Sequence, residues 1–156
     1  MRGEDEQAMR PFSASLPMAL LLARESTMRR FRPLLADHGL TEQQWRVLRA
    51  LAASDHPIEV TVLADRTALL APSITRIVAR LVDDGLIHRS AVPSDARRSV
   101  LELTAKGRRV VARIAPKSEA TYADIEAAFG TERLATLLTE LHELAAIIEP
   151  DTQEAS

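Results

Sequence analysis

Short hydroxyl side chains and guanidinium groups lie close together in one stretch of this sequence. The stretch contains Ser73, Thr75, Arg76 and Arg80. A guanidinium group can donate two hydrogen bonds to O6 and N7 of guanine, and hydroxyl groups bind phosphate oxygens or bases. On a helix, these residues predict a surface that contacts DNA, with Arg76 reading a base. The alternatives are a solvated Arg76 or one paired with Asp83, and for Ser73 a hydrogen bond at the helix start.

The apolar residues of the same stretch have helical spacing. Pro72 suits a first helical position, because its missing N–H would have no partner there. One face of the helix is predicted to carry Ile74, Ile77, Val78, Leu81 and Val82. Gly85 predicts the end of the helix, since glycine adopts the left-handed conformation at little cost. An earlier short helix is expected to open at residues 63–66, and Ala71, between the two helices, is a poor N-cap residue.

A second group of charged residues follows in a predicted hairpin. Two apolar runs flank a polar turn that contains Asp95, Arg97 and Arg98. A helix, a turn, a second helix and a hairpin with a basic tip predict a winged helix-turn-helix over about residues 58–104. From the residues alone, Asp95 and Arg97 form an ordinary ion pair of a turn, which contributes little energy.

The net charge of −2 conceals an uneven distribution along the chain. Residues 58–114 contain ten Arg and Lys against six Asp and Glu, whereas residues 115–156 contain two against nine. A polyanion responds to the local field more than to the total charge. The basic excess falls on the segment expected to contact DNA, so the near-neutral total does not argue against a nucleic-acid partner.

Two predicted helical regions flank this DNA-binding lobe, at about residues 15–37 and 105–148. The first carries more apolar surface than one packing face needs, and the end of the second repeats leucines at spacings of three and four residues. Both are expected to pair with a second copy of the chain; the alternative is that the last helix packs onto its own subunit. Residues 15–150 are then one domain, mainly α with a small β-wing, between a flexible arm at 1–14 and a disordered tail at 151–156.

A capping box marks the start of another helix. Thr41 and Gln44 have the spacing at which each side chain accepts a hydrogen bond from the other residue's backbone N–H, and Leu40 and Trp45 occupy the apolar staple positions beside them. Trp45 is therefore first expected to pack in the core.

Several classes of site are excluded by composition and spacing. The chain has no cysteine, so disulfides and thiolate metal sites are absent, and the four histidines form no ligand-spaced pair. No glycine-rich phosphate loop, nucleophile motif or acid–base pair is found, so neither an enzyme nor a cofactor is expected. The longest apolar run, residues 18–23, is too short for a signal sequence or a membrane span, which predicts a cytoplasmic protein.

At the wing, the sequence resembles the MarR family of transcriptional regulators. The residues that carry the resemblance are Asp95-Ala96-Arg97, followed by Leu101-Glu102-Leu103-Thr104-Ala105-Lys106-Gly107, with Pro72-Ser73-Ile74-Thr75-Arg76 as the recognition helix. Within the family, the homoprotocatechuate-degradation operon repressors are similar in the blocks Ala19–Glu25, Phe31–Pro33 and Leu40–Arg46. The likeness spans about residues 15–148.

The resemblance implies a homodimer that binds a near-palindromic operator in double-stranded DNA and usually represses. It implies that Arg97 enters the minor groove, where a narrow groove concentrates negative potential, with Asp95 holding its guanidinium group. Arg98 is expected to contact a phosphate. The alternative function is a winged-helix module that binds another protein, without control by a ligand.

The resemblance also implies release from DNA by a small phenolic or aromatic acid, of the hydroxyphenylacetate type in the subgroup. A carboxylate ligand needs a positive donor, and an aromatic ring needs apolar walls. Arg24 and Arg46 are the predicted donors, and Trp45 is the predicted wall of the pocket. The alternatives are solvated arginines and a tryptophan that serves only the core.

Overall fold

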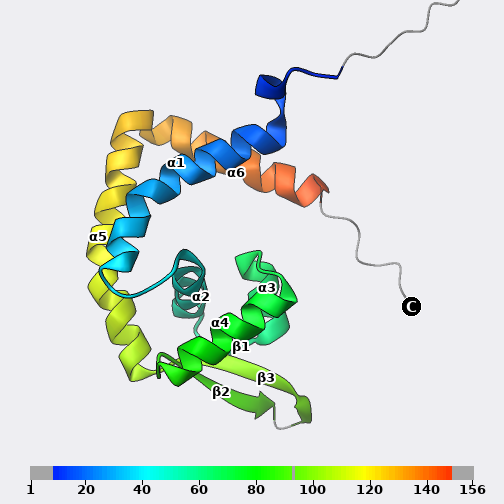
Figure 1. The fold of residues 1–156 in the computed structure, drawn as a ribbon, viewed down its shortest axis with the longest axis vertical. Coiled ribbons are helices and arrows are strands. Elements are labelled where there is room, and N and C mark those ends of the chain that lie inside the picture. The colour runs from blue at the N-terminus through cyan, green and yellow to red at the C-terminus, as the bar shows by residue number, and fades with distance from the viewer. Residues whose placement is uncertain (1–8, 93, 149–156) are drawn as a thin grey trace, which may run out of the picture. The chain divides into compact units, whose positions relative to one another are not determined.

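The computed structural model describes residues 9–92 and 94–148. Residues 1–8 of the predicted arm, Pro93 in the wing turn and the predicted tail at 151–156 lie outside the described residues. The elements in chain order (Figure 1) are η1 (Phe12–Ala14), α1 (Leu16–Ala36), α2 (Glu42–Ala52), β1 (Ile58–Glu59), α3 (Val60–Thr67), α4 (Ala71–Asp83), β2 (Ile87–Val92), β3 (Asp95–Leu103), α5 (Ala105–Phe129) and α6 (Thr131–Ile148). The fold is mainly helical with a small β-wing, as the sequence predicts.

The chain divides into two compact units within α5. Met1–Pro116 form the first unit and Lys117–Ser156 the second. The first unit contains the helix-turn-helix and the wing, and the second contains the end of α5 and all of α6. None of the helices among the described residues combines the length and apolar character needed to span a membrane.

The three strands form one antiparallel sheet in the order β1-β3-β2. Ile58 lies opposite Leu101 on β3, and Ile87 on β2 lies opposite Leu103. These side chains are buried, so this part of the sheet contributes one apolar face to the core. The strands thereby attach the wing to the helices of the lobe.

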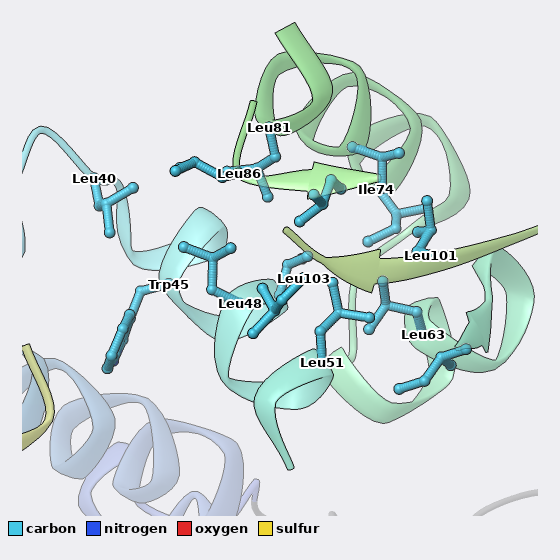
Figure 2. Close-up of a cluster of buried hydrophobic side chains, with 14 of the residues drawn as sticks. Leu40, Trp45, Leu48, Leu51, Leu63, Ile74, Leu81, Leu86, Leu101 and Leu103 are labelled. Atoms are coloured by element: carbon cyan, nitrogen blue, oxygen red, sulfur yellow. The ribbon is translucent and has the colours of Figure 1, made fainter. Parts of the chain in front are cut away.

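The core of the first unit joins α2, α3, α4 and the sheet. Figure 2 shows Leu51 of α2 beside Leu63 of α3, with Leu48 of α2 and Ile74 of α4 in the same buried cluster. Leu63 and Leu48 are completely inaccessible to solvent. Burial of a leucine of this kind stabilises a fold by about 1.5–3 kcal/mol, so these contacts fix the direction of α4 relative to the wing.

The boundaries of the two short helices differ from the expectation. α3 begins at Val60, three residues before the predicted opening, because β1 ends at Glu59 in an extended conformation that passes straight into the helix. α4 begins at Ala71, with Leu70 as the N-cap, so Pro72 is the second residue of the helix and not the first. Proline is accommodated there since N–H groups of the first turn have no partner within the helix.

The predicted caps are confirmed. Thr41 Oγ1 accepts from Gln44 N–H at 3.1 Å, and Gln44 Oε1 accepts from Thr41 N–H at 2.9 Å. Gly85 has a φ of +68°, the left-handed conformation expected after α4. The predicted N-terminal arm contains one turn of 3-10 helix at Phe12–Ala14 among its described residues.

Candidate nucleic-acid interface

Helix α4 presents a buried apolar side and an exposed polar side. Ile74, Val78 and Leu81 are buried, whereas Thr75, Arg76 and Arg80 are exposed. Ile77 is half-buried, and Val82, predicted to share the apolar face, is 36% exposed because it lies at the edge of that face. The helix is therefore anchored in the core along one side and open to a partner along the other.

The polar groups on α4 differ in how far they are already engaged. Within the part of the chain that the structure describes, no hydrogen bond or ion pair reaches the Arg76 guanidinium group, so Asp83 does not neutralise it. Arg80 Nε donates to Asp84 Oδ2 at 3.0 Å, and Thr75 Oγ1 donates to the Ala71 carbonyl oxygen at 2.9 Å. Ser73 is half-buried, and its backbone N–H donates to the Leu70 carbonyl oxygen. Arg76 is thus the most available cation of the helix.

The end of α4 is fastened to the start of α5. Thr104 Oγ1 donates to the Gly85 carbonyl oxygen at 2.7 Å and accepts from Gly107 N–H at 3.0 Å, so this hydroxyl also caps α5. Lys106 Nζ donates to the Asp84 carbonyl oxygen at 2.6 Å, where a cation is favoured by the helix dipole. In the sequence, Lys106 and Gly107 carry only the family resemblance; their spacing after Thr104 is the signal that indicates this junction.

The wing carries three arginines in different environments. Arg97 is exposed, and none of the described residues forms an ion pair with its guanidinium group. Arg98 donates to both carboxylate oxygens of Glu59, and this hydrogen bonding raises the pKa of Arg98. Arg89 Nε donates to Ser99 Oγ at 3.0 Å. Arg97 is therefore the wing cation that is left open for a partner.

Asp95 does not hold the Arg97 guanidinium group as expected. Its Oδ1 accepts a hydrogen bond from the backbone N–H of Arg97 at 3.0 Å. A short acidic side chain readily accepts from a backbone N–H two residues further on, and this turn replaces the predicted ion pair. Asp95 therefore shapes the backbone of the wing tip and leaves the Arg97 side chain free.

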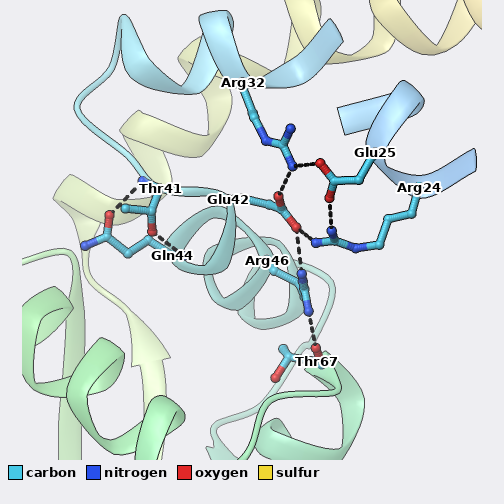
Figure 3. A network of polar contacts seen from close by, with 8 residues as sticks. All are labelled: Arg24, Glu25, Arg32, Thr41, Glu42, Gln44, Arg46 and Thr67. Atoms are coloured by element: carbon cyan, nitrogen blue, oxygen red, sulfur yellow. Dashed lines mark hydrogen bonds and ion pairs between the residues drawn. The ribbon is translucent and has the colours of Figure 1, made fainter. Parts of the chain in front are cut away.

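The predicted effector residues Arg24 and Arg46 meet at a third residue, Glu42. Figure 3 shows the Glu42 carboxylate between Arg24 and Arg32 of α1 and Arg46 of α2. Arg46 Nη2 lies 2.9 Å from Glu42 Oε1, and its Nη1 donates to the Thr67 carbonyl oxygen at 2.9 Å. The network ties α1 and α2 to the end of α3. Sequence reasoning missed Glu42 and Arg32, although Glu42 lies inside the capping box.

Charge in this network is nearly balanced, with three arginines against two carboxylates. Arg32 Nη2 donates to Glu25 Oε2 at 2.8 Å, and this hydrogen bond is the main cause of a lowered pKa for Glu25. Glu42 is the least exposed member, with 17% of its side chain accessible. The site already contains the arrangement that a bound carboxylate would require: guanidinium groups converging on one anion.

Trp45 lies in the core and not in this charged network. It is 6% exposed and belongs to the cluster that includes Leu40 and Leu48 (Figure 2), which agrees with its staple position. A cavity of about 280 Å³ lies elsewhere, where the end of α2 and the loop after it approach β3 and the first turns of α5. Its polar lining residues are Ser54, Asp55, His56, Glu102 and Arg108. None of the three predicted effector residues lines it.

Among the residues that the structure describes, no group of three or more His, Asp or Glu side chains is arranged to hold a metal ion. The described side chains that converge on one point are the arginines and carboxylates around Glu42, and these form ion pairs.

The sequence pattern of the MarR family matches residues 38–98, which include α2, both helices of the helix-turn-helix and most of the wing. The chain is 41% identical over 133 residues to the homoprotocatechuate degradative operon repressor of Escherichia coli, which covers 85% of this chain and 89% of that protein. Identity at this level over most of both chains establishes a common family.

Two examples of solved structures with this fold are NadR and CouR. NadR in complex with 4-hydroxyphenylacetate has a TM-score of 0.78 and 36% identity, covering 88% of this chain and 97% of NadR. The transcriptional repressor CouR, bound to a 23-mer DNA duplex, has a TM-score of 0.77 and 29% identity, covering 88% and 97% of the two chains. The arrangement of helices described above is therefore one that occurs both with a phenolic acid and with DNA.

Proposed function

We propose that this chain, which belongs to the MarR family, is a ligand-responsive regulator of transcription that binds operator DNA through α4 and the wing. The observation that carries the proposal is the exposure of two guanidinium groups, Arg76 on α4 and Arg97 on the wing, with no partner among the described residues. Its relatives are named as regulators and not as enzymes.

In this proposal α4 enters the major groove. Arg76 donates to a guanine, while Ser73 and Thr75 contact phosphates or bases through their hydroxyl groups. Arg80 adds a phosphate contact at the cost of its exposed pair with Asp84. The phosphate contacts fix the position of the protein along the duplex, and the base contact of Arg76 supplies the sequence preference.

The wing enters the adjacent minor groove with Arg97. The turn made by Asp95 supports this role, because it fixes the backbone at Arg97 and leaves the side chain unengaged. Arg98 already has a carboxylate partner in Glu59, so in this proposal its guanidinium group does not make the predicted phosphate contact.

The active form is a homodimer on a near-palindromic operator. Support comes from apolar side chains that are exposed in the single chain: Leu137, Leu138 and Ile147 on α6, and Leu21 and Leu22 on α1. Large apolar side chains left exposed on a helix are typical of a surface that another protein covers. A two-fold dimer places its two recognition helices about 34–36 Å, or one DNA turn, apart.

The effector is a small phenolic or aromatic acid of the hydroxyphenylacetate type. Its carboxylate would compete with Glu42 for the guanidinium groups of Arg24 and Arg46, whereas Trp45 packs in the core apart from these groups. Arg46 also donates to the carbonyl oxygen of Thr67, the last residue of α3. Movement of Arg46 towards a ligand would therefore alter the turn that leads into α4, and the ligand shifts the protein towards a form that binds DNA less well.

The regulated genes are those of an aromatic-compound degradation operon, of the homoprotocatechuate or hydroxyphenylacetate type, and the protein acts as their repressor in the cytoplasm. Support comes from the identity to the Escherichia coli repressor over most of both chains.

Binding to a duplex selected from a random-sequence library tests the proposal. Fluorescence anisotropy should give sequence-specific binding that weakens when 4-hydroxyphenylacetate is added, and calorimetry should show that the acid binds the protein. Absence of binding to any duplex at low ionic strength would overturn the DNA function and leave a protein-binding module. DNA binding that no aromatic acid changes would remove only the effector.

A further inference from the structure

The register of the wing hairpin is interrupted beside its tip. Ala91 lies opposite Ser99, but the next residue of β2, Val92, lies opposite Asp95. The pairing between β2 and β3 therefore skips residues 96–98. Regular strand pairing fixes the direction of each side chain, and that constraint is missing where Arg97 and Arg98 are found.

A contact from another strand supplies a constraint at this place. Glu59, the last residue of β1, lies opposite Val100 on β3, two residues from Arg98. Arg98 Nε donates to Glu59 Oε2 at 3.0 Å, and Arg98 Nη2 donates to Glu59 Oε1. A guanidinium group that meets a carboxylate with two parallel hydrogen bonds is held in direction as well as distance. The pair thus fixes Arg98 across 39 residues of sequence.

The same pair decides what Arg98 offers to DNA. About half of the Arg98 side chain, 53%, is accessible, so a phosphate could reach it. The Glu59 carboxylate occupies the side of the Arg98 guanidinium group that would bind a phosphate. The negative charge of Glu59 also cancels the attraction between Arg98 and the DNA phosphates. Arg97, one residue away, has no such partner among the described residues.

We propose that Glu59 is a specificity-determining residue of the wing: its carboxylate holds the Arg98 guanidinium group and keeps that cation off the phosphate backbone. Non-specific affinity for DNA arises from phosphate contacts, whereas sequence preference arises from base contacts. By withholding one cation, Glu59 lowers binding to all sequences and leaves the contribution of Arg76 unchanged. The inference rests on the proposed DNA binding.

The salt dependence of binding to a random-sequence 30-base-pair duplex tests this role. Each phosphate contact adds about 0.9 to the slope of log K against log salt concentration. We expect Glu59→Gln to steepen the slope by about 0.9 for each wing that engages the duplex. The matched control is Glu102→Gln, which removes the same charge from an exposed residue of β3 whose carboxylate forms no hydrogen bond or ion pair with the described residues.

Variants of Arg98 show whether this residue is the cation that steepens the salt slope of Glu59→Gln. Arg98→Gln alone should leave the wild-type slope unchanged, and Glu59→Gln combined with Arg98→Gln should return the slope to the wild-type value. A slope that falls by about 0.9 in Arg98→Gln would mean that Arg98 already contacts phosphate, and would overturn the inference. So would equal slopes for Glu59→Gln and Glu102→Gln.

These failures are distinguishable from failure of the proposed function. If the wild-type protein does not bind the duplex at any salt concentration, both the function and the inference fall. If it binds and the Glu59 and Glu102 variants behave alike, only the inference falls. Circular dichroism of each variant confirms that the fold is retained.

Discussion

Gly107 lies so close to the carbonyl oxygen of Leu86 that a β-carbon at position 107 would be 2.0 Å from that oxygen. The neighbour is the backbone of the residue that precedes β2, and it has no flexible end that could move aside. The first turn of α5 and the turn after α4 are therefore in direct backbone contact, beside the hydrogen bond from Thr104 to Gly85.

Gly107→Ala should lower the free energy of unfolding by about 1–3 kcal/mol, because the added methyl group forces the two backbones apart. Chemical denaturation measures the change. Helix propensity alone predicts that Gly107→Ala raises the free energy of unfolding, since alanine in a helix is favoured over glycine by about 1 kcal/mol. Ala112→Gly, at an exposed position of the same helix, gives the size of that propensity effect. A stabilised Gly107→Ala variant would show that the close contact is absent.

Ala68→Gly should leave stability unchanged or raise it by up to about 1 kcal/mol. Ala68 has a φ of +50° in the turn between α3 and α4, and a left-handed conformation costs a non-glycine residue about 1–2 kcal/mol. The greater freedom of glycine in the unfolded chain offsets part of the gain. The side chain is exposed, so no packing is lost. Thermal unfolding beside Ala79→Gly, which should be destabilised in the middle of α4, checks the sign.

Arg76→Ala should weaken operator binding by about 1–3 kcal/mol and relax the preference at one base position. The reason is the loss of a guanidinium group that can donate two hydrogen bonds to guanine. Anisotropy titrations against single-base variants of the selected duplex measure the effect. Arg113→Ala removes the same charge from an exposed residue of α5, outside α4 and the wing, and serves as the control. Equal losses for both variants would reduce Arg76 to a general electrostatic contribution.

Arg97→Ala should weaken binding to all duplexes alike and reduce the salt slope by about one unit. A minor-groove arginine interacts with the potential of the groove and discriminates little between bases. Titrations of the selected and the random duplex at several salt concentrations measure the slope. A loss confined to the selected duplex would instead assign Arg97 a base-reading role.

Acid should remove the stabilising effect of Glu25. Its pKa is lowered mainly by the hydrogen bond from Arg32, so the folded protein holds this proton less tightly than the unfolded chain. The contribution is present above the unfolded pKa and disappears as the pH falls through the folded pKa. The difference in unfolding free energy between wild type and Glu25→Gln should therefore be largest near neutral pH and vanish in acid. A difference that is independent of pH would exclude the ion pair as its cause.

Patterns among neighbouring residues predicted the helices and strands. Contacts between residues far apart in the sequence set where these helices and strands end and which side chains pair. The capping box of Thr41 and Gln44 was predicted because it lies within four residues. The start of α3 at Val60 was not, because it depends on β1 pairing with a strand about forty residues later. The same holds for Arg98, whose partner Glu59 is adjacent only after the sheet forms, and for Arg24, whose partner Glu42 lies on another helix.

The wing tip illustrates a second reason for error. Opposite charges two residues apart, Asp95 and Arg97, suggested an ion pair, but the backbone N–H competed successfully for the carboxylate. A short side chain reaches the nearby backbone with less loss of conformational freedom than a long arginine side chain would suffer in meeting it. Pairing rules based on charge alone overlook this competitor.

The attachment of α4 to α5 has a mechanical consequence. Three contacts, from Thr104, Lys106 and Gly107, join the residues that directly follow α4, Asp84 to Leu86, to the start of α5. If the first turn of α5 rotates, the C-terminal end of α4 has to move with it. Any adjustment of α4 that leaves α5 at rest has to be absorbed at the opposite end, in the three-residue link from Ala68 to Leu70.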